Sequence, residues 1–172
     1  MACALSLGRI EPCKDVVGGI TSVYFLNYQE LTVTYDATNT DAIDVLGSGL
    51  TAYKYDLKGS SSFEQTVTSS RDTGTTFFDQ NLNLTLHKLS KQSNKEIKLM
   101  AYGRPIVIVE DYNGNFFVAG LENGCEVTGG TIVTGAAMGD LSGYTLTLNG
   151  QEQVPANFLD STLAAAGISL SF

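Results

Sequence analysis

Residues 75–89, TTFFDQNLNLTLHKL, carry a two-residue periodicity that strongly limits the folds open to this chain. The residues at every second position are Phe78, Gln80, Leu82, Leu84 and Leu86. This period is typical of a β-strand with one face against a core and the other in solvent. Residues 60–70 precede it, separated by the turn signal Arg71-Asp72-Thr73-Gly74. The pattern therefore predicts a long β-hairpin with residues 71–74 at its tip.

Short strand patterns and glycine-containing turns recur along the rest of the chain. The predicted strands cover 20–28, 31–37, 51–57, 106–111, 116–122, 144–150 and 168–172. The stretch IVIVED (106–111) is apolar on both faces, which predicts a central strand, and Asn113-Gly114 is a strong hairpin signal. Residues 36–50 are mostly polar and acidic, so they are predicted as a loop insertion, and 60–80 as a second, hairpin insertion.

One helix is predicted with start and stop signals, over about 93–103. Ser93 and Glu96 fit a capping box, Gly103 would supply a left-handed C-cap, and Pro105 would prevent continuation. The tail also has room for a short helix near 157–166.

Strands that follow one another through hairpins favour antiparallel sheets in a sandwich or barrel, here with one flanking helix. We therefore expect a mainly β domain over 20–158. Residues 1–19 are predicted as an N-terminal arm, and 159–172 as a C-terminal arm.

Charge limits the classes of partner. The 172 residues contain only ten Lys and Arg and have a net charge of −8, which argues against tight nucleic-acid binding. With 16% charged residues, the polar surface must come largely from Ser, Thr, Asn and Gln, which suits a protein that contacts neighbours. No convincing signal peptide and no membrane-length apolar window is seen, so we expect a protein kept soluble inside a cell, without a membrane partner.

The run GGTIVTGAAMGDLSG (129–143) resembles a phosphate-binding loop only superficially. Gly130 and Gly135 have the Walker A spacing, but Ala136 and Ala137 stand where Lys and then Ser or Thr are needed, and there is no GxG. We expect a strand at 131–134, followed by a loop in which Gly135 and Gly139 let backbone approach backbone. No cofactor is predicted.

No catalytic or metal-ligating set emerges from the motifs. Asp111, Asn113, Asn115 and Glu122 have calcium-loop spacing, but Phe116 takes the required glycine position. The single His87 has no nucleophile elbow to serve, and Cys3, Cys13 and Cys125 are too far apart for a zinc site, although a Cys3–Cys13 bridge stays open. Two alternatives also stay open: a β-rich enzyme with paired carboxylates drawn from Asp111, Glu122 or Asp140, and a carbohydrate-binding sandwich.

The second half of the chain resembles small virion proteins of tailed bacteriophages that infect Bacteroidota, crAss-like or related. The shared motifs are Arg104-Pro105, Asp111, Asn113-Gly114, Gly120, Asn123-Gly124, residues 127–130, Gly135, Gly139-Asp140 and residues 143–148. Residues 1–28 are similar to the N-terminus of that family. The middle, 36–92, matches less clearly.

The resemblance implies a tail-tube fold that assembles into a ring, as a hexamer or dodecamer, in a tail tube or in a tail or neck ring. Neighbouring tail, neck or portal proteins would be its partners in the virion, after assembly in the host cytoplasm. Genomic DNA would pass the channel during ejection without specific binding. Assembly contacts are then expected from Arg71 and Asp72 at the hairpin tip and from Gly135, Gly139 and Asp140 in the glycine-rich loop.

Overall fold

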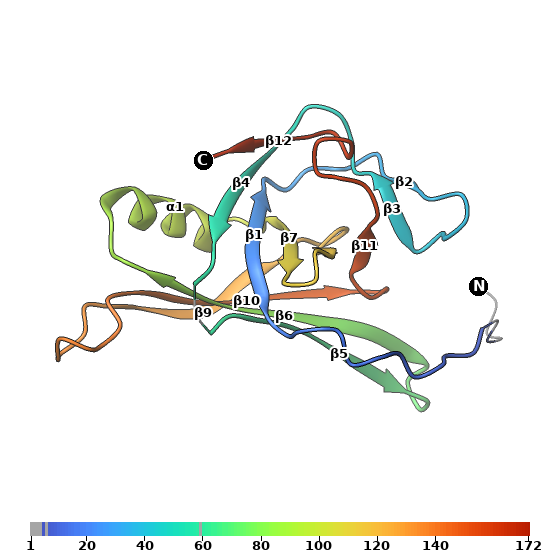
Figure 1. Ribbon diagram of the computed structural model, residues 1–172, viewed down its shortest axis with the longest axis horizontal. Coiled ribbons are helices and arrows are strands. Elements are labelled where there is room, and N and C mark those ends of the chain that lie inside the picture. The colour runs from blue at the N-terminus through green and yellow to red at the C-terminus, as the bar shows by residue number, and fades with distance from the viewer. Residues whose placement is uncertain (1–4, 6, 59) are drawn as a thin grey trace.

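The computed structural model describes residues 5, 7–58 and 60–172, which form two β-sheets and one helix (Figure 1). The smaller sheet has the order β5 (Ser62–Ser70), β6 (Thr75–His87), β10 (Gly143–Glu152) and β9 (Glu126–Val133). All its pairings are antiparallel. Its long strands form the lower layer in Figure 1. The predicted hairpin with its tip at 71–74 is confirmed.

The larger sheet has eight strands, and two of its pairings are parallel. Its order is β12 (Ile168–Ser171), β4 (Leu50–Asp56), β1 (Ile20–Leu26), β7 (Ile106–Asp111), β8 (Phe116–Ala119), β11 (Asn157–Leu159), β3 (Ala42–Val45) and β2 (Thr34–Tyr35). β12 runs parallel to β4, and β11 runs parallel to β3. The expected mainly β sandwich with one short helix is confirmed. In the described part of the chain the order ends at β12 and β2, so no closed barrel is present and the sheet is not purely antiparallel.

Two apolar clusters hold the layers together. One lies between the sheets and contains Val23 and Val109 from the larger sheet and Leu84 and Leu148 from the smaller one. The other joins Tyr24 and Ile108 to Ile43, Leu163 and Ile168, so the larger sheet curls over its second face. β1 and β7 are therefore buried on both faces, which confirms the predicted central strand at 106–111.

The helix α1 (Lys91–Tyr102) begins earlier than the sequence suggested. Ser90, not Ser93, is the N-cap, and its side chain accepts a hydrogen bond from the Ser93 N–H. The proposed capping box is therefore wrong: Ser93 lies inside the first turn. Gly103 is extended rather than left-handed, with φ −99°, and its N–H donates to the Leu99 carbonyl.

Three further expectations are corrected by long-range packing. Residues 36–50 include the strand β3, because Ile43 is fully buried in the second cluster. The expected strand at 31–37 shortens to Thr34–Tyr35. The helix proposed near 157–166 is absent, since 157–159 pair with β8 and β3 and turns follow.

The two chain termini differ in how they relate to the sheets. Residues 159–172 are not an arm, because Leu159, Leu163 and Ile168 are buried and β12 pairs with β4. Residues 5 and 7–19, by contrast, lie outside both sheets. In Figure 1 this N-terminal segment runs beside β5 toward the hairpin tip.

Candidate functional site

The exposed face of the four-stranded sheet is built from amide and hydroxyl side chains. β6 and β10 alternate, so Leu residues point to the core and polar residues point outward. Three cross-strand hydrogen bonds link the outward residues: Thr147 Oγ1 to Asn83 Oδ1 at 3.0 Å, Asn149 Nδ2 to Asn81 Oδ1 at 2.8 Å, and Gln151 Nε2 to Asp79 Oδ1 at 2.8 Å. We call these six residues the amide ladder. Such cross-strand pairs stabilise the sheet and its register and make this face polar.

The neighbouring strands continue this face on both sides. Thr131 and Thr145 share a hydroxyl–hydroxyl hydrogen bond of 2.6 Å between β9 and β10. On β5, the exposed Glu64 and Thr66 stand opposite Asn81 and Asp79 of the amide ladder. None of the four strands contains a Lys or Arg. The side chains of this sheet therefore contribute no Lys or Arg charge, although the whole chain has ten Lys and Arg residues.

The two outer strands of this sheet, β5 and β9, are edge strands with no second strand partner in the described residues, although α1 contacts β9 and residues 17–20 lie near β5. In the part of the chain that the structure describes, β5 pairs only with β6, and β9 pairs only with β10. Soluble proteins usually protect such edges with Lys, Pro or a covering element. Neither strand contains Lys or Pro, and each carries one charged residue, Glu64 or Glu126. The strands have nine and eight residues, so their lengths match.

The glycine-rich loop at 134–142 is organised by Asp140. Its Oδ2 accepts hydrogen bonds from the N–H groups of Ala136 (2.9 Å) and Ala137 (2.7 Å), and these bonds lower the pKa of the carboxyl group. Gly135 is left-handed, with φ +76°, and a Cβ there would lie 2.8 Å from the Asp140 Cβ. The close approach predicted at Gly135 is thus confirmed. The strand before it is longer than expected, because β9 begins at Glu126.

Gly139 does not share this requirement. A Cβ at Gly139 would meet no atom within 4 Å, and its φ is outside the left-handed region. The predicted close approach within the subunit is therefore wrong at Gly139, because the loop turns outward at this point. A role in contacts between subunits stays a prediction.

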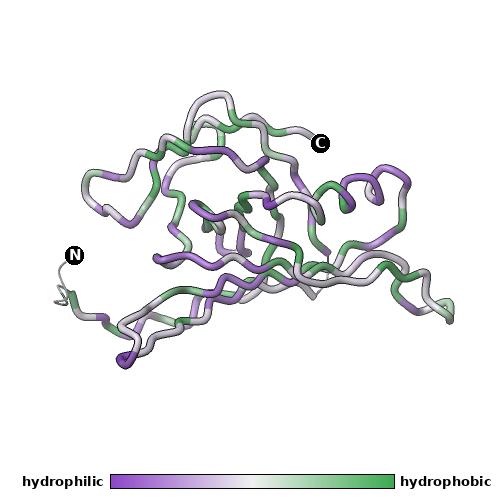
Figure 2. Tube along the Cα trace, turned by 180° about the vertical axis from the view of Figure 1, so that it is seen from behind, coloured by the Kyte–Doolittle hydropathy of each residue, from purple (hydrophilic) through white to green (hydrophobic). Residues whose placement is uncertain are grey.

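The predicted assembly residues lie at the two opposite ends of the four-stranded sheet (Figure 1). Arg71 and Asp72 are exposed at the tip of the β5–β6 hairpin. Gly135, Gly139 and Asp140 lie in the loop at the other end, between β9 and β10. Figure 2 shows that the hairpin tip is hydrophilic, whereas the opposite loop has a hydrophobic tip where Met138 is fully exposed.

Two of the carboxylates considered for metal or catalytic roles, Asp111 and Asp140, are engaged in turns. Asp111 accepts hydrogen bonds from the backbone and side-chain N–H groups of Asn113 and Asn115, at 2.8–3.2 Å. This pattern explains the calcium-like spacing as a hairpin turn. Asp140 holds its own loop as described above. Across residues 5, 7–58 and 60–172, no three His, Cys, Asp or Glu side chains are grouped to hold a metal ion.

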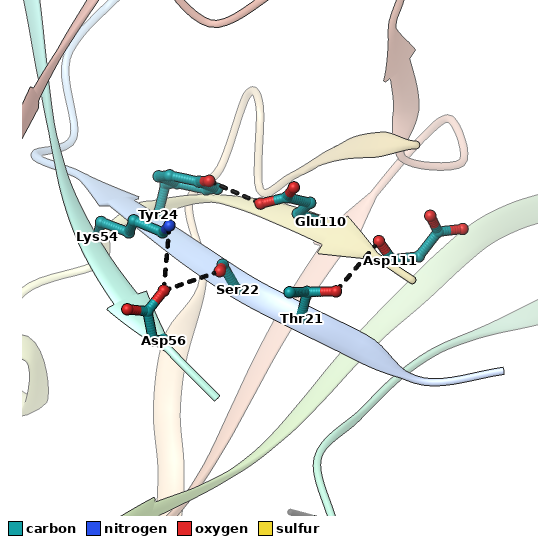
Figure 3. Close-up of polar contacts among 7 residues, drawn as sticks. All are labelled: Thr21, Ser22, Tyr24, Lys54, Asp56, Glu110 and Asp111. Carbon is teal, nitrogen blue, oxygen red and sulfur yellow. Dashed lines mark hydrogen bonds and ion pairs between the residues drawn. The ribbon is translucent and has the colours of Figure 1, made fainter. Parts of the chain in front are cut away.

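A polar cluster that no sequence motif predicted links β4, β1 and β7 (Figure 3). The Tyr24 hydroxyl donates to Glu110 Oε2 at 2.6 Å, and burial together with this carboxylate raises the pKa of Tyr24. Asp56 Oδ1 accepts from the Ser22 hydroxyl at 3.2 Å and pairs with Lys54 Nζ at 3.1 Å. The two hydrogen bonds run between neighbouring strands, whereas the ion pair joins two residues of β4, so the cluster is best explained as reinforcement of the sheet.

A second polar group is buried beneath the turn at 120–125. Glu152 is 3% exposed and accepts hydrogen bonds from the N–H groups of Glu122 and Asn123. Burial raises the pKa of this carboxyl group. Burial also raises the pKa of the neighbouring Cys125 thiol to about 12, which leaves it inert. Cys13 is exposed, whereas Cys3 and the possible Cys3–Cys13 bridge lie outside the described residues.

No protein-family model, curated protein or solved structure matches the chain. Within the described segments, no helix has the length and apolar character to cross a membrane.

Proposed function

We propose that the protein is a virion structural protein of a tailed bacteriophage, which assembles into a ring of the tail or neck channel. The observation that carries this proposal is the pair of open, matched edges on one sheet, β5 and β9. A sheet with two such edges leaves rows of unpaired N–H and C=O groups, and pairing between copies satisfies them.

Strand direction favours a closed ring of this kind. β5, β6, β10 and β9 alternate in direction, so β5 and β9 of one subunit are antiparallel to each other. Rotation about a ring axis preserves strand direction. β9 of one copy therefore meets β5 of the next in the antiparallel sense, and the sheet continues without a break. Such a head-to-tail contact generates closed rings when the rotation closes.

The chemistry of the amide ladder suits the wall of a channel for nucleic acid. Binding to DNA depends on Lys and Arg neutralising phosphates, and the four strands have none. Acidic groups such as Glu64 and Asp79 repel phosphates, so DNA would slide instead of adhering. The net charge of −8 and the resemblance to phage tail-tube proteins support the same function.

The test is cross-linking followed by electron microscopy. In a background with Cys3→Ser and Cys13→Ser, the variants Thr66→Cys on β5 and Thr131→Cys on β9 are made singly and together. Both positions are exposed. With a flexible bismaleimide, the double variant should give a ladder of covalent oligomers that ends at the ring size, and each single variant should stay monomeric on a denaturing gel.

Several outcomes would count against the ring. Dimers from a single variant would indicate a two-fold contact, β5 with β5 or β9 with β9, instead of a ring. Electron microscopy of the purified protein and of phage particles should show the ring and its position. A protein that is monomeric at high concentration and absent from purified particles would overturn the proposal.

A further inference from the structure

The N-terminal arm, residues 5 and 7–17, presents aliphatic side chains to solvent. Leu5, Leu7 and Ile10 are 100%, 91% and 93% exposed. The base of the arm is held to the β7–β8 turn, where Asn113 accepts from the Val17 N–H at 3.0 Å and donates to the Val17 carbonyl at 2.8 Å. In the described part of the arm before Val17, no hydrogen bond reaches the rest of the subunit. The arm is thus anchored at its base and has an apolar surface without a partner.

A groove of about 430 Å³ lies at the other end of the molecule, between α1 and the strands β1 and β4. Its floor is aromatic and aliphatic and includes Tyr55, Leu99 and Met100. Ile97 is the buried residue of α1, whereas the side chain of Leu99 is 51% exposed and faces the groove. Charged groups flank the groove: Glu96 on α1, and Arg104, whose guanidinium stacks over the Tyr28 ring at 4.3 Å.

The placement of the two features prevents them from meeting within one subunit. Figure 1 shows the N-terminal segment leaving the molecule beside the β5–β6 hairpin, whereas α1 lies at the opposite end. A second copy displaced along the long axis would bring its arm to this groove. The same displacement brings the hydrophilic hairpin tip of one copy toward the 134–142 loop of the other.

We infer that the N-terminal arm of one copy docks into the groove between α1 and β4 of a second copy. Leu7 and Ile10 cover Leu99 and Met100, which removes apolar surface of both copies from water. Arg9 and Glu11 of the arm match the charges of Glu96 and Arg104 on the flanks. This contact rests on the proposed self-assembly, but it stacks copies along the long axis and is separate from the β5–β9 contact within a ring.

The direct test uses the native Cys13 as a probe in the full chain, with Cys3→Ser in every variant. A bismaleimide should join Cys13 of one copy to Leu99→Cys of another and give covalent dimers and longer products. Lys98→Cys, on the opposite side of α1, is the matched control and should give little product. Adding Cys13→Ser to Leu99→Cys should abolish the product. Equal cross-linking of the Lys98→Cys variant, or products that persist without Cys13, would overturn the docking.

A second measurement tests the apolar contact itself. Leu7→Asp with Ile10→Asp should lower the yield of the Cys13–Leu99→Cys product at least about tenfold, because each lost aliphatic contact is worth more than a factor of ten. Lys14→Asp, a change in the same arm away from the apolar positions, should have little effect.

The cross-links between Thr66→Cys and Thr131→Cys test the ring contact independently of arm docking. If they form at a concentration at which the Cys13–Leu99→Cys product does not, arm docking is wrong and the ring stands. If the arm product forms without them, the ring contact is wrong. The absence of both products overturns both.

Discussion

At the scale of single residues, Gly135 and Asp140 form one structural unit. Asp140 holds the N–H groups of Ala136 and Ala137, and the left-handed Gly135 makes room for it. We expect Gly135→Val to lower the free energy of unfolding by about 1–3 kcal/mol, because a β-branched residue is strained at positive φ. Thermal or denaturant unfolding measures this, with Gly139→Val as the matched control. Equal destabilisation of both variants would contradict the account.

The buried Glu152 gives a pH-dependent prediction. Its folded pKa is raised above the ordinary value of 4.5, mainly by burial. Its contribution to stability is therefore fully present below about pH 4.5 and is lost as pH rises through the folded pKa. We expect the stability of wild type relative to Glu152→Gln to fall between pH 4 and pH 7. Chemical unfolding of both proteins across this range measures it.

The matched control for that experiment is Glu126→Gln, the same change at an exposed position. The carboxyl groups of Asp111 and Asp140 act in the opposite direction. Their folded pKa values are lowered, so their contribution is lost as pH falls below the ordinary value of 3.8. The stabilities of wild type and Glu152→Gln should therefore be compared above pH 4. A wild-type to Glu152→Gln difference that is flat with pH would contradict the prediction.

At the scale of elements, the anchor of the N-terminal arm depends on one amide. Asn113→Asp removes the donor to the Val17 carbonyl and places a carboxylate beside Asp111. We expect faster tryptic cleavage after Arg9 and Lys14, with the domain intact. Asn115→Asp, which leaves the Val17 contact in place, is the control. Unchanged cleavage in the Asn113 variant would show that the arm is held in another way.

The open edge of β5 gives a second prediction at this scale. Thr66→Lys places a charge on the exposed edge strand, which opposes pairing with another strand. We expect rings to be lost in sedimentation velocity and in electron micrographs, while circular dichroism and the melting temperature stay close to wild type. Ser48→Lys adds the same charge at an exposed turn position and should assemble. Assembly of both variants would exclude β5 from the contact.

Local patterns predicted the hairpins well and the long-range strands poorly. The tip at 71–74 and the Asn113-Gly114 turn have strong local signals, and both are confirmed. β3 was missed because one of its two partners, β11, lies more than a hundred residues away and runs parallel to it, and the other, β2, has only two residues. The helix start was misplaced because Ser90 and Ser93 are both good caps, and only the structure shows which one accepts the hydrogen bond.

Only part of the candidate surface could be predicted from the sequence. Alternation in NLNLTL and YTLTLNG placed polar side chains on one face of each strand. The pairing of Asn83 with Thr147 and of Asn81 with Asn149 depends on the register between β6 and β10, which no local pattern gives.

At the scale of the whole molecule, the absence of basic residues from the four-stranded sheet makes a prediction for the assembled ring. Asn83→Lys would add one positive charge for each subunit on the exposed face. We expect these rings to retain double-stranded DNA at low salt and release it as salt rises, whereas wild-type rings retain none. Lys98→Arg keeps the charge of α1 and is the control. Retention by wild type would contradict the proposed channel wall.

The two parallel pairings also have a consequence for the order of folding. β11 and β12, from residues 157–171, join strands formed by residues 42–56 and complete the curled sheet. Pairings between such distant segments form slowly, because a long loop must close first. The hairpin of β5 and β6 is local and can form early. The edge of β5 is thus exposed before the larger sheet is complete. The timing of synthesis and the concentration of nascent chains therefore affect whether subunits assemble or aggregate.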